Sequence, residues 1–109
     1  MEFKSIHRYA RMSPRKIRYV IDLIRGRSVS EAFEILRVTN KRASYMVNKV
    51  LNSALANADE SAEVNVESLR IKVARVDEGP TRKWHRPRSR GMWNQILKRT
   101  SHITIILSN

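Results

Sequence analysis

The amino-acid sequence predicts an α+β fold in which three helices pack on a small three-stranded antiparallel sheet and a long β-hairpin protrudes. Apolar residues recur every three or four positions in three segments between residues 14 and 58, which is typical of amphipathic helices. Near residues 69–73 and 103–107 they alternate with other residues, as they do in strands. The 109 residues, 41% of them hydrophobic and none a cysteine, suit a single domain over 1–109 that needs no disulfide.

The first strand and the first helix are predicted at the amino-terminal end. Residues 2–12 mix apolar and basic side chains, which favours an irregular edge strand or an extended arm. Ser13 and Pro14 predict a helix start, because serine offers an N-cap oxygen and proline has the φ angle of the first helical position. Gly26 is expected to end this helix. Its apolar face comprises Ile17, Val20, Ile21 and Ile24.

Two more helices follow. Ser28 and Glu31 have the spacing of a capping box, which predicts a short second helix. Thr39 or Asn40 is expected to cap the third helix. The buried side of the second helix is predicted to be Val29, Ala32, Phe33, Ile35 and Leu36. The third helix carries the most regular apolar stripe of the chain, formed by Ala43, Met46, Val47, Val50, Leu51, Ala54 and Ala58.

Two strands are predicted in the carboxy-terminal half, within residues 68–77 and 103–107. The segment between them is too long for an ordinary turn in so small a domain. We therefore expect residues 79–99 to form a two-stranded hairpin arm that reaches roughly 30 Å beyond the body, at ~3.3 Å per residue. Its seven cations and no anion repel one another, so the free arm should be mobile and should become ordered among phosphates.

The hydrophobic pattern also predicts how the strands pair. If the chain reverses at Ser89, antiparallel pairing places Ile71 opposite Leu107 and Val73 opposite Ile105. The apolar faces of the two strands then coincide. This register is the one expected for the central pair of the sheet.

Charge is segregated along the chain. The total is 22 Lys and Arg against 10 Asp and Glu, a net charge of +12. Residues 1–27 carry 8 cations and 2 anions, residues 28–78 carry 7 and 8, and residues 79–109 carry 7 and none. Two basic regions therefore flank a nearly neutral middle, which indicates a nucleic-acid partner. An acidic cluster expected at a pole away from that partner consists of Asp59, Glu60, Glu63 and Glu67.

Catalysis finds little support in the residues. The three histidines lie far apart and lack metal-ligand spacing, and no glycine-rich phosphate loop exists. We therefore expect no enzyme activity, no catalytic residues, no bound metal and no cofactor. The sequence contains no apolar run long enough to span a membrane, so a soluble, cytoplasmic protein without membrane contact is expected.

Two tryptophans, Trp84 and Trp93, are interleaved with the cations of the predicted arm. Aromatic side chains that stack on bases, together with cations that neutralise phosphates, are a common route to RNA binding. The alternative is a simple hairpin on whose surface the two indoles pack on each other. We favour the RNA-binding interpretation, because exposed indoles on so basic an arm require an apolar partner.

Six motifs together resemble the bacterial large-subunit ribosomal protein twenty-two family, the universal uL-twenty-two family. They occur in the order and at the spacing of that family and cover nearly the whole chain. The motifs are MSPRK (12–16), DLIRG (22–26), TNKR (39–42), DEGP (77–80), PRSRG (87–91) and KRTSHIT (98–104).

The resemblance implies a protein that binds large-subunit rRNA, aids subunit assembly and lines the nascent-peptide exit tunnel with the tip of its hairpin. It places PRSRG at that tip, KRTSH at the base of the hairpin on rRNA, and the MSPRK motif at a basic helix entrance. The sequence departs from the family pattern at Trp84, Ser89, Met92 and Trp93. The residues expected at the tunnel tip are Trp84, Pro87, Arg88, Ser89, Arg90, Gly91, Met92 and Trp93.

The residues expected to contact RNA lie in both basic regions and at the start of the third helix. On one flank of the first helix, clear of its apolar face, Arg15, Arg18 and Arg25 should reach phosphates. The full set is Arg8, Arg11, Ser13, Arg15, Lys16, Arg18, Arg25, Lys41, Arg42, Arg82, Lys83, Arg86, Arg88, Arg90, Lys98, Arg99, Thr100, Ser101 and His102.

The expected partners are large-subunit rRNA, other large-subunit ribosomal proteins and, near the hairpin tip, the nascent polypeptide. The free protein is expected to be a monomer. Sequence physics alone also allows a dimeric DNA-bending architectural protein whose β-arm inserts Pro87 into a minor groove. Such proteins normally pair two arms in a dimer, and the sequence shows no large second apolar face for dimerisation.

Overall fold

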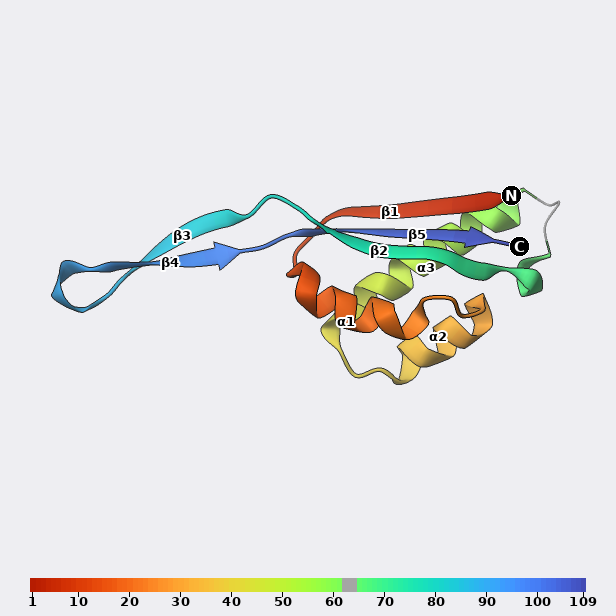
Figure 1. Cartoon of the computed structure of the whole chain (residues 1–109), viewed down its shortest axis with the longest axis horizontal. Helices are drawn as coiled ribbons and strands as arrows, with labels where there is room; N and C mark the ends of the chain where they lie inside the picture. Colours follow the sequence, from red (N-terminus) through yellow and green to blue (C-terminus); the bar gives the residue numbers. More distant parts are fainter. Residues whose placement is uncertain (62–64) are drawn as a thin grey trace.

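The structure, a computed structural model, describes residues 1–61 and 65–109, and within them three α-helices form a layer beside a three-stranded antiparallel sheet with a projecting two-stranded arm (Figure 1). The predicted fold class is confirmed. Glu63, part of the predicted acidic cluster, lies outside the described residues. The elements are β1 (Glu2–Ala10), α1 (Pro14–Ile24), α2 (Val29–Val38), α3 (Arg42–Glu60), the short 3-10 helix η1 (Val66–Ser68), β2 (Arg70–Glu78), β3 (Arg82–Pro87), the 3-10 turn η2 (Ser89–Gly91), β4 (Trp93–Lys98) and β5 (Ser101–Ser108).

The strand β5 lies at the centre of the sheet, between β1 and β2. Successive side chains of β5 point to opposite faces of the sheet, and Ile103, Ile105 and Leu107 are fully buried on the face that the helices cover. Helices α1 and α3 pack on the sheet, and α2 packs on both of them. As predicted, β1 is an edge strand.

The predicted register of the central pair is correct at one end of the strands and wrong further along. Ile71 lies opposite Leu107 as predicted, but Val73 pairs with Ile106 and not with Ile105. Ala74 takes the place opposite Ile105. The cause is an irregularity between Ile71 and Val73, where one extra residue in β2 shifts the pairing.

The helix stripes pack as predicted, with small differences at the helix starts. Ser13 is the N-cap of α1, but its hydroxyl forms no capping hydrogen bond with the described backbone. Ser28 caps α2 and accepts a hydrogen bond from the Glu31 amide at 3.4 Å. The prediction for α3 is wrong, because its N-cap is Lys41. The Thr39 hydroxyl instead donates to the Ile35 carbonyl at the end of α2, at 2.6 Å.

Two arginines of the α1 region cover the outer edge of β2. The Arg18 guanidinium donates to the Val76 carbonyl, with its closer nitrogen at 2.9 Å, and the Arg25 guanidinium donates to the Ala74 carbonyl at 2.8 Å. Arg25 also pairs with Asp22 at 2.5 Å. Both arginines were predicted to reach phosphates, and the structure gives them a structural role at the sheet edge.

The loop between α1 and α2 also covers the outer edge of β2. The Ile71 amide donates to the Arg27 carbonyl at 3.0 Å, and the Val29 amide donates to the Leu69 carbonyl at 3.2 Å. Outward-facing backbone groups of an edge strand otherwise invite pairing with another chain. Together, the arginines and the loop occupy the edge of β2 along most of its length.

On the face of the sheet away from the helices, Lys72 forms an exposed ion pair with Glu2, which links β2 to β1 across β5. The hydrogen bond from Lys72 and its positive charge lower the pKa of Glu2. The stabilising effect of this pair is therefore present above the ordinary pKa of glutamate and is lost as the pH falls. An exposed pair of this kind contributes little to the free energy of unfolding.

The arm, residues 79–99, continues β2 and β5 away from the body (Figure 1). In it, Arg82 pairs with Lys98 and Pro87 pairs with Trp93, so the chain reverses around Arg90 and not around Ser89 as predicted. The molecule is 65 Å long, 24 Å wide and 16 Å deep. Since nine residues of β2 span roughly 30 Å at ~3.3 Å per residue, the arm supplies about half of that length.

We expect replacement of Arg18 and Arg25 by alanine to lower the free energy of unfolding by about 1–3 kcal/mol, because two carbonyls lose charge-assisted hydrogen bonds. Urea denaturation followed by circular dichroism measures the loss. Arg15→Ala on the exposed flank of the same helix is the matched control and should stay within about ±0.5 kcal/mol of the unaltered protein. Equal effects in the two variants would show that the edge contacts do not stabilise β2.

Candidate nucleic-acid interface

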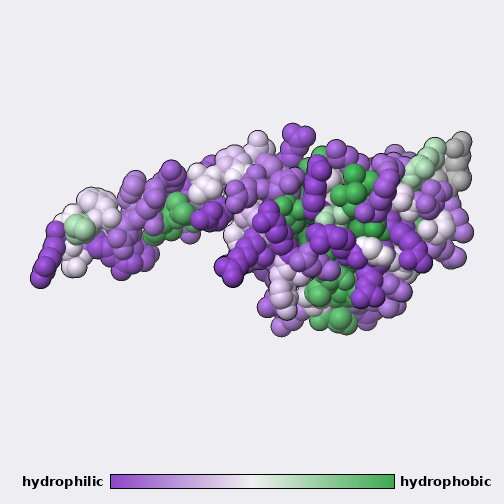
Figure 2. Space-filling view, viewed as in Figure 1, coloured by the Kyte–Doolittle hydropathy of each residue, from purple (hydrophilic) through white to green (hydrophobic). Residues whose placement is uncertain are grey.

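The arm presents its side chains to solvent on both faces. Every residue of β3 is exposed, and in β4 only Ile96 is partly buried. Figure 2 shows an arm covered mainly by hydrophilic side chains, with small apolar patches between them. The arm therefore has no core of its own, as its composition predicts.

The two tryptophans lie on opposite faces of this ribbon. Trp84 is paired with Ile96, and Trp93 is paired with Pro87. Because side chains alternate along a strand, these two cross-strand pairs point to opposite sides. The indoles are 57% and 65% exposed, and the alternative in which they pack on each other is wrong.

The tip of the arm is a tight turn over residues 88–92. The Arg88 amide donates to the Met92 carbonyl at 2.7 Å, and the Met92 amide donates to the Ser89 carbonyl at 3.3 Å. Arg90 has a φ angle of +60° and Gly91 one of +70°, so two consecutive residues adopt the left-handed conformation. Pro87 and Trp93 close the strands beneath the turn. Of the residues predicted at the tip, Trp84 alone lies elsewhere, near the root of the arm.

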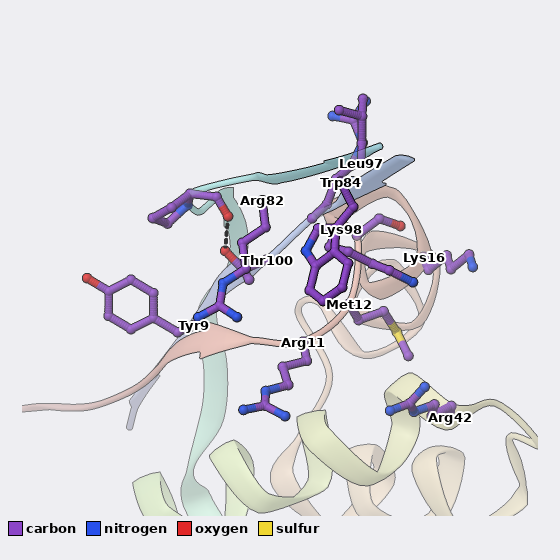
Figure 3. A pocket seen from close by; sticks show the side chains of 13 residues that line it. Tyr9, Arg11, Met12, Lys16, Arg42, Arg82, Trp84, Leu97, Lys98 and Thr100 are labelled. Atoms are coloured by element: carbon purple, nitrogen blue, oxygen red, sulfur yellow. Dashed lines mark hydrogen bonds between the residues drawn. The ribbon is translucent and has the colours of Figure 1, made fainter. Parts of the chain in front are cut away.

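At that root, between the arm and the body, lies a cavity of about 940 Å³, which we call the elbow cavity (Figure 3). Six of its residues are cations, and among the described residues that line it none is acidic. Four separate segments form its walls. The lining residues are Tyr9, Arg11, Met12, Ser13, Lys16, Arg42, Pro80, Arg82, Trp84, Leu97, Lys98, Arg99 and Thr100.

The neck that joins arm and body is held by Gly79, Pro80 and Thr100. The Gly79 amide donates to the Thr100 carbonyl at 2.9 Å, and the Thr100 hydroxyl donates to the Pro80 carbonyl at 2.6 Å (Figure 3). A Cβ at position 79 would overlap the Thr100 hydroxyl. Glycine therefore allows close approach of the two strands here without displacing that hydroxyl from the Pro80 carbonyl.

A second set of contacts fixes the wall formed by β1. Tyr9 has a φ angle of +60°, which is rare outside glycine, and its amide donates to Nδ1 of His102 at 3.0 Å. The two rings meet edge to face with centroids 5.0 Å apart. Ser101 is fully buried and donates to the Met12 carbonyl at 2.6 Å. The prediction that the Ser101 hydroxyl contacts RNA thus gives way to a structural role.

The other predicted RNA-binding residues are distributed around these features. The structure brings Arg11, Lys16 and Arg42 of the body to the elbow cavity together with the cations of the arm root. Lys41 lies apart from them, with its ammonium 5.4 Å from the ring centre of Tyr19. Arg8 and Arg15 are exposed on β1 and α1. Sequence reasoning missed Tyr9, Met12, Pro80 and Leu97, because only the folded chain brings these residues to one cavity.

Within residues 1–61 and 65–109 no group of three histidine, aspartate or glutamate side chains is placed to hold a metal ion. None of the described helices is both long and apolar enough to cross a membrane.

The fold and the candidate interface define a class: a small α+β protein that carries exposed basic side chains on a coreless arm and at its root. Comparison with known proteins narrows this class. Residues 5–108 match the family described as ribosomal protein L22p/L17e. The chain is 57% identical over 107 residues to the large ribosomal subunit protein uL22 of Thermus thermophilus, covering 98% of this chain and 95% of that protein.

Other relatives carry the same name. The uL22 protein of Macrococcus caseolyticus is 51% identical over 109 residues, which cover 100% of this chain and 88% of that protein. The uL22 protein of Akkermansia muciniphila is 51% identical over 109 residues, with 100% and 97% covered. The chain belongs to the L22 family of ribosomal proteins, and it is a structural component of the large ribosomal subunit.

We expect Gly79→Ala to lower the free energy of unfolding by about 1–3 kcal/mol, because the added methyl group forces the neck strands apart. Thermal denaturation measures the effect. The double variant Gly79→Ala with Thr100→Ala removes the overlapping hydroxyl and should regain part of the loss. A single variant as stable as the unaltered protein would show that the neck accommodates a side chain.

Proposed function

We propose that this protein binds large-subunit rRNA through its arm and the basic surface at the arm root, aids subunit assembly, and lines the nascent-peptide exit tunnel with the arm tip. The observation that carries the proposal is the arm itself. It has seven cations, no anion and no core, and it extends from a body that has a buried hydrophobic core. Such an arm gains stability when phosphates surround it.

Binding would draw its free energy mainly from the release of counterions. Each phosphate neutralised by lysine or arginine frees condensed ions from the RNA, so affinity should fall steeply with salt. The arm would fill gaps between RNA helices that phosphate repulsion otherwise keeps apart. Specificity would come from RNA shape, because the deep major groove of A-form RNA hides its base edges from side chains.

The tip would face a different environment from the rest of the arm. Met92 and Trp93 are large, apolar and more than 60% exposed beside the left-handed turn. A nascent polypeptide near the tip would meet these side chains together with Arg88 and Arg90. Other large-subunit proteins would be further partners, and the free protein would be a monomer.

Salt-dependent binding to large-subunit rRNA fragments and to duplex DNA of equal length tests the proposed function. We expect preferential RNA binding by a monomer, with a log–log salt slope that indicates several phosphate contacts at roughly 0.7–0.9 per phosphate. Sedimentation in the same buffers gives the oligomeric state. Equal or tighter DNA binding by a dimer would contradict the proposal and favour a DNA-bending protein.

Replacement of both Arg88 and Arg90 by alanine should separate RNA binding from folding. Because both side chains are exposed, the free energy of unfolding should change by at most about 0.5 kcal/mol per site. Incorporation of the variant into large subunits, measured in competition with the unaltered protein, should fall. Arg37→Ala on the exposed surface of α2 is the control. A large loss of stability would show that the tip contributes to the fold.

A further inference from the structure

We propose that the elbow cavity binds a single unpaired RNA nucleotide, whose base stacks on Trp84 while the surrounding cations hold its phosphates. This inference rests on the proposed function and names the part of an RNA that one site would recognise. The site is the cavity at the arm root, and no residue of the arm tip belongs to it.

The composition of the cavity matches a nucleotide. Apolar side chains from both the arm and the body form one part of the wall, with Trp84 and Met12 as the main members. Figure 3 shows the indole of Trp84 extending from the arm toward Met12, with Lys98 beside it. Cations surround this apolar part: Arg11, Lys16, Arg42, Arg82, Lys98 and Arg99.

This charge distribution favours a polyanion as the occupant. Six cations surround one cavity, and none of its described lining residues is acidic. These cations repel one another, and a bound anion would relieve that repulsion. A protein segment would have to carry several carboxylates and an apolar side chain together. RNA has that combination at every nucleotide, because each base is attached to a phosphate backbone.

The indole of Trp84 also favours an unpaired nucleotide over a paired one. In a duplex the base faces are covered by their stacked neighbours, and an indole in a cavity cannot reach them. A bulged or looped nucleotide can leave the stack and place its face on an aromatic side chain. Trp84 keeps 57% of its surface exposed in the free protein, so it is available for such contact. The volume of about 940 Å³ lies in the range of roughly 300–1,000 Å³ found for small-molecule sites.

The walls are held in place before any ligand arrives. The neck hydrogen bonds of Gly79 and Thr100 fix the root of the arm, and the bond from Ser101 to Met12 fixes the loop below it. The left-handed Tyr9 is held by His102 on the remaining side. A backbone conformation of this kind persists only where its surroundings enforce it, and such positions gather at binding sites.

The test uses two RNA hairpins that differ only by one unpaired nucleotide in the stem, titrated with the intact protein. We expect the bulged hairpin to bind roughly ten-fold more tightly, the size of effect that base–aromatic stacking gives in alanine substitutions. Trp84→Ala should remove this preference, so that the variant binds the two hairpins with equal affinity. Trp84→Phe should keep most of it. Trp93→Ala, on the opposite face of the arm, is the matched control and should keep all of it.

A fluorescence measurement supplies an independent readout that does not depend on removing Trp84. In the Trp93→Phe variant Trp84 is the sole indole, and its emission should be quenched by the bulged hairpin more than by the paired one. Equal affinity for the two hairpins, an unchanged preference in Trp84→Ala, or equal quenching by both would overturn the proposal. If both hairpins bind equally and with a steep salt slope, the elbow site fails while RNA binding stands. If neither binds, the proposed function fails as well.

Discussion

The antiparallel pairing of β2 with β5 is the interaction on which the rest of the structure depends. It places Ile71 against Leu107 and Val76 against Ile103, and these four side chains belong to the buried core. The same two strands leave the body and become the arm, so the register of the core also sets how the arm begins. A slip of one residue would turn the apolar side of β5 to solvent and misalign the neck at the same time. Core and interface are therefore specified by one set of contacts.

The basic charge of this chain serves both the fold and its partner. Arg18 and Arg25 donate to carbonyls on the edge of β2, where they replace the hydrogen bonds that a further strand would make. Their aliphatic stems run from α1, so the helix is tied to the sheet at its polar border as well as through its apolar face. The number of cations in the chain is therefore larger than the number whose side chains are free to contact phosphates. In the arm the two numbers are closest, because its side chains are exposed.

The sequence predicts the parts that local pattern controls. The stripe on α3, the start of α1 at Pro14 and the hairpin arm all follow from spacing and composition, and the structure confirms them. The pairing of Val73 was missed because the alternation was extended from Leu69 and Ile71 to Val73, whereas the apolar positions change phase at Ala74 and Val76, as a bulge in β2 requires. The N-cap at Lys41 was missed because Thr39 and Asn40 are better capping residues, and Thr39 is engaged at the end of α2. The elbow cavity joins four segments that are separate in the sequence, and no local pattern encodes its position.

The position of the neck contacts at the root of the arm has a physical reason. A two-stranded ribbon without a core does not fix its own orientation relative to the body. The contacts at the neck fix it: Gly79 bonds to Thr100, and Tyr9 bonds to His102. Phosphates bound at the root would neutralise the cations that the body and the arm bring together there. Neutralisation would remove the repulsion between the cations of the body and those of the arm, which otherwise disfavours the orientation that brings them together. Ligand at the elbow would thus stabilise the orientation that a distant tip needs, and binding at the root would be thermodynamically coupled to placement of the tip.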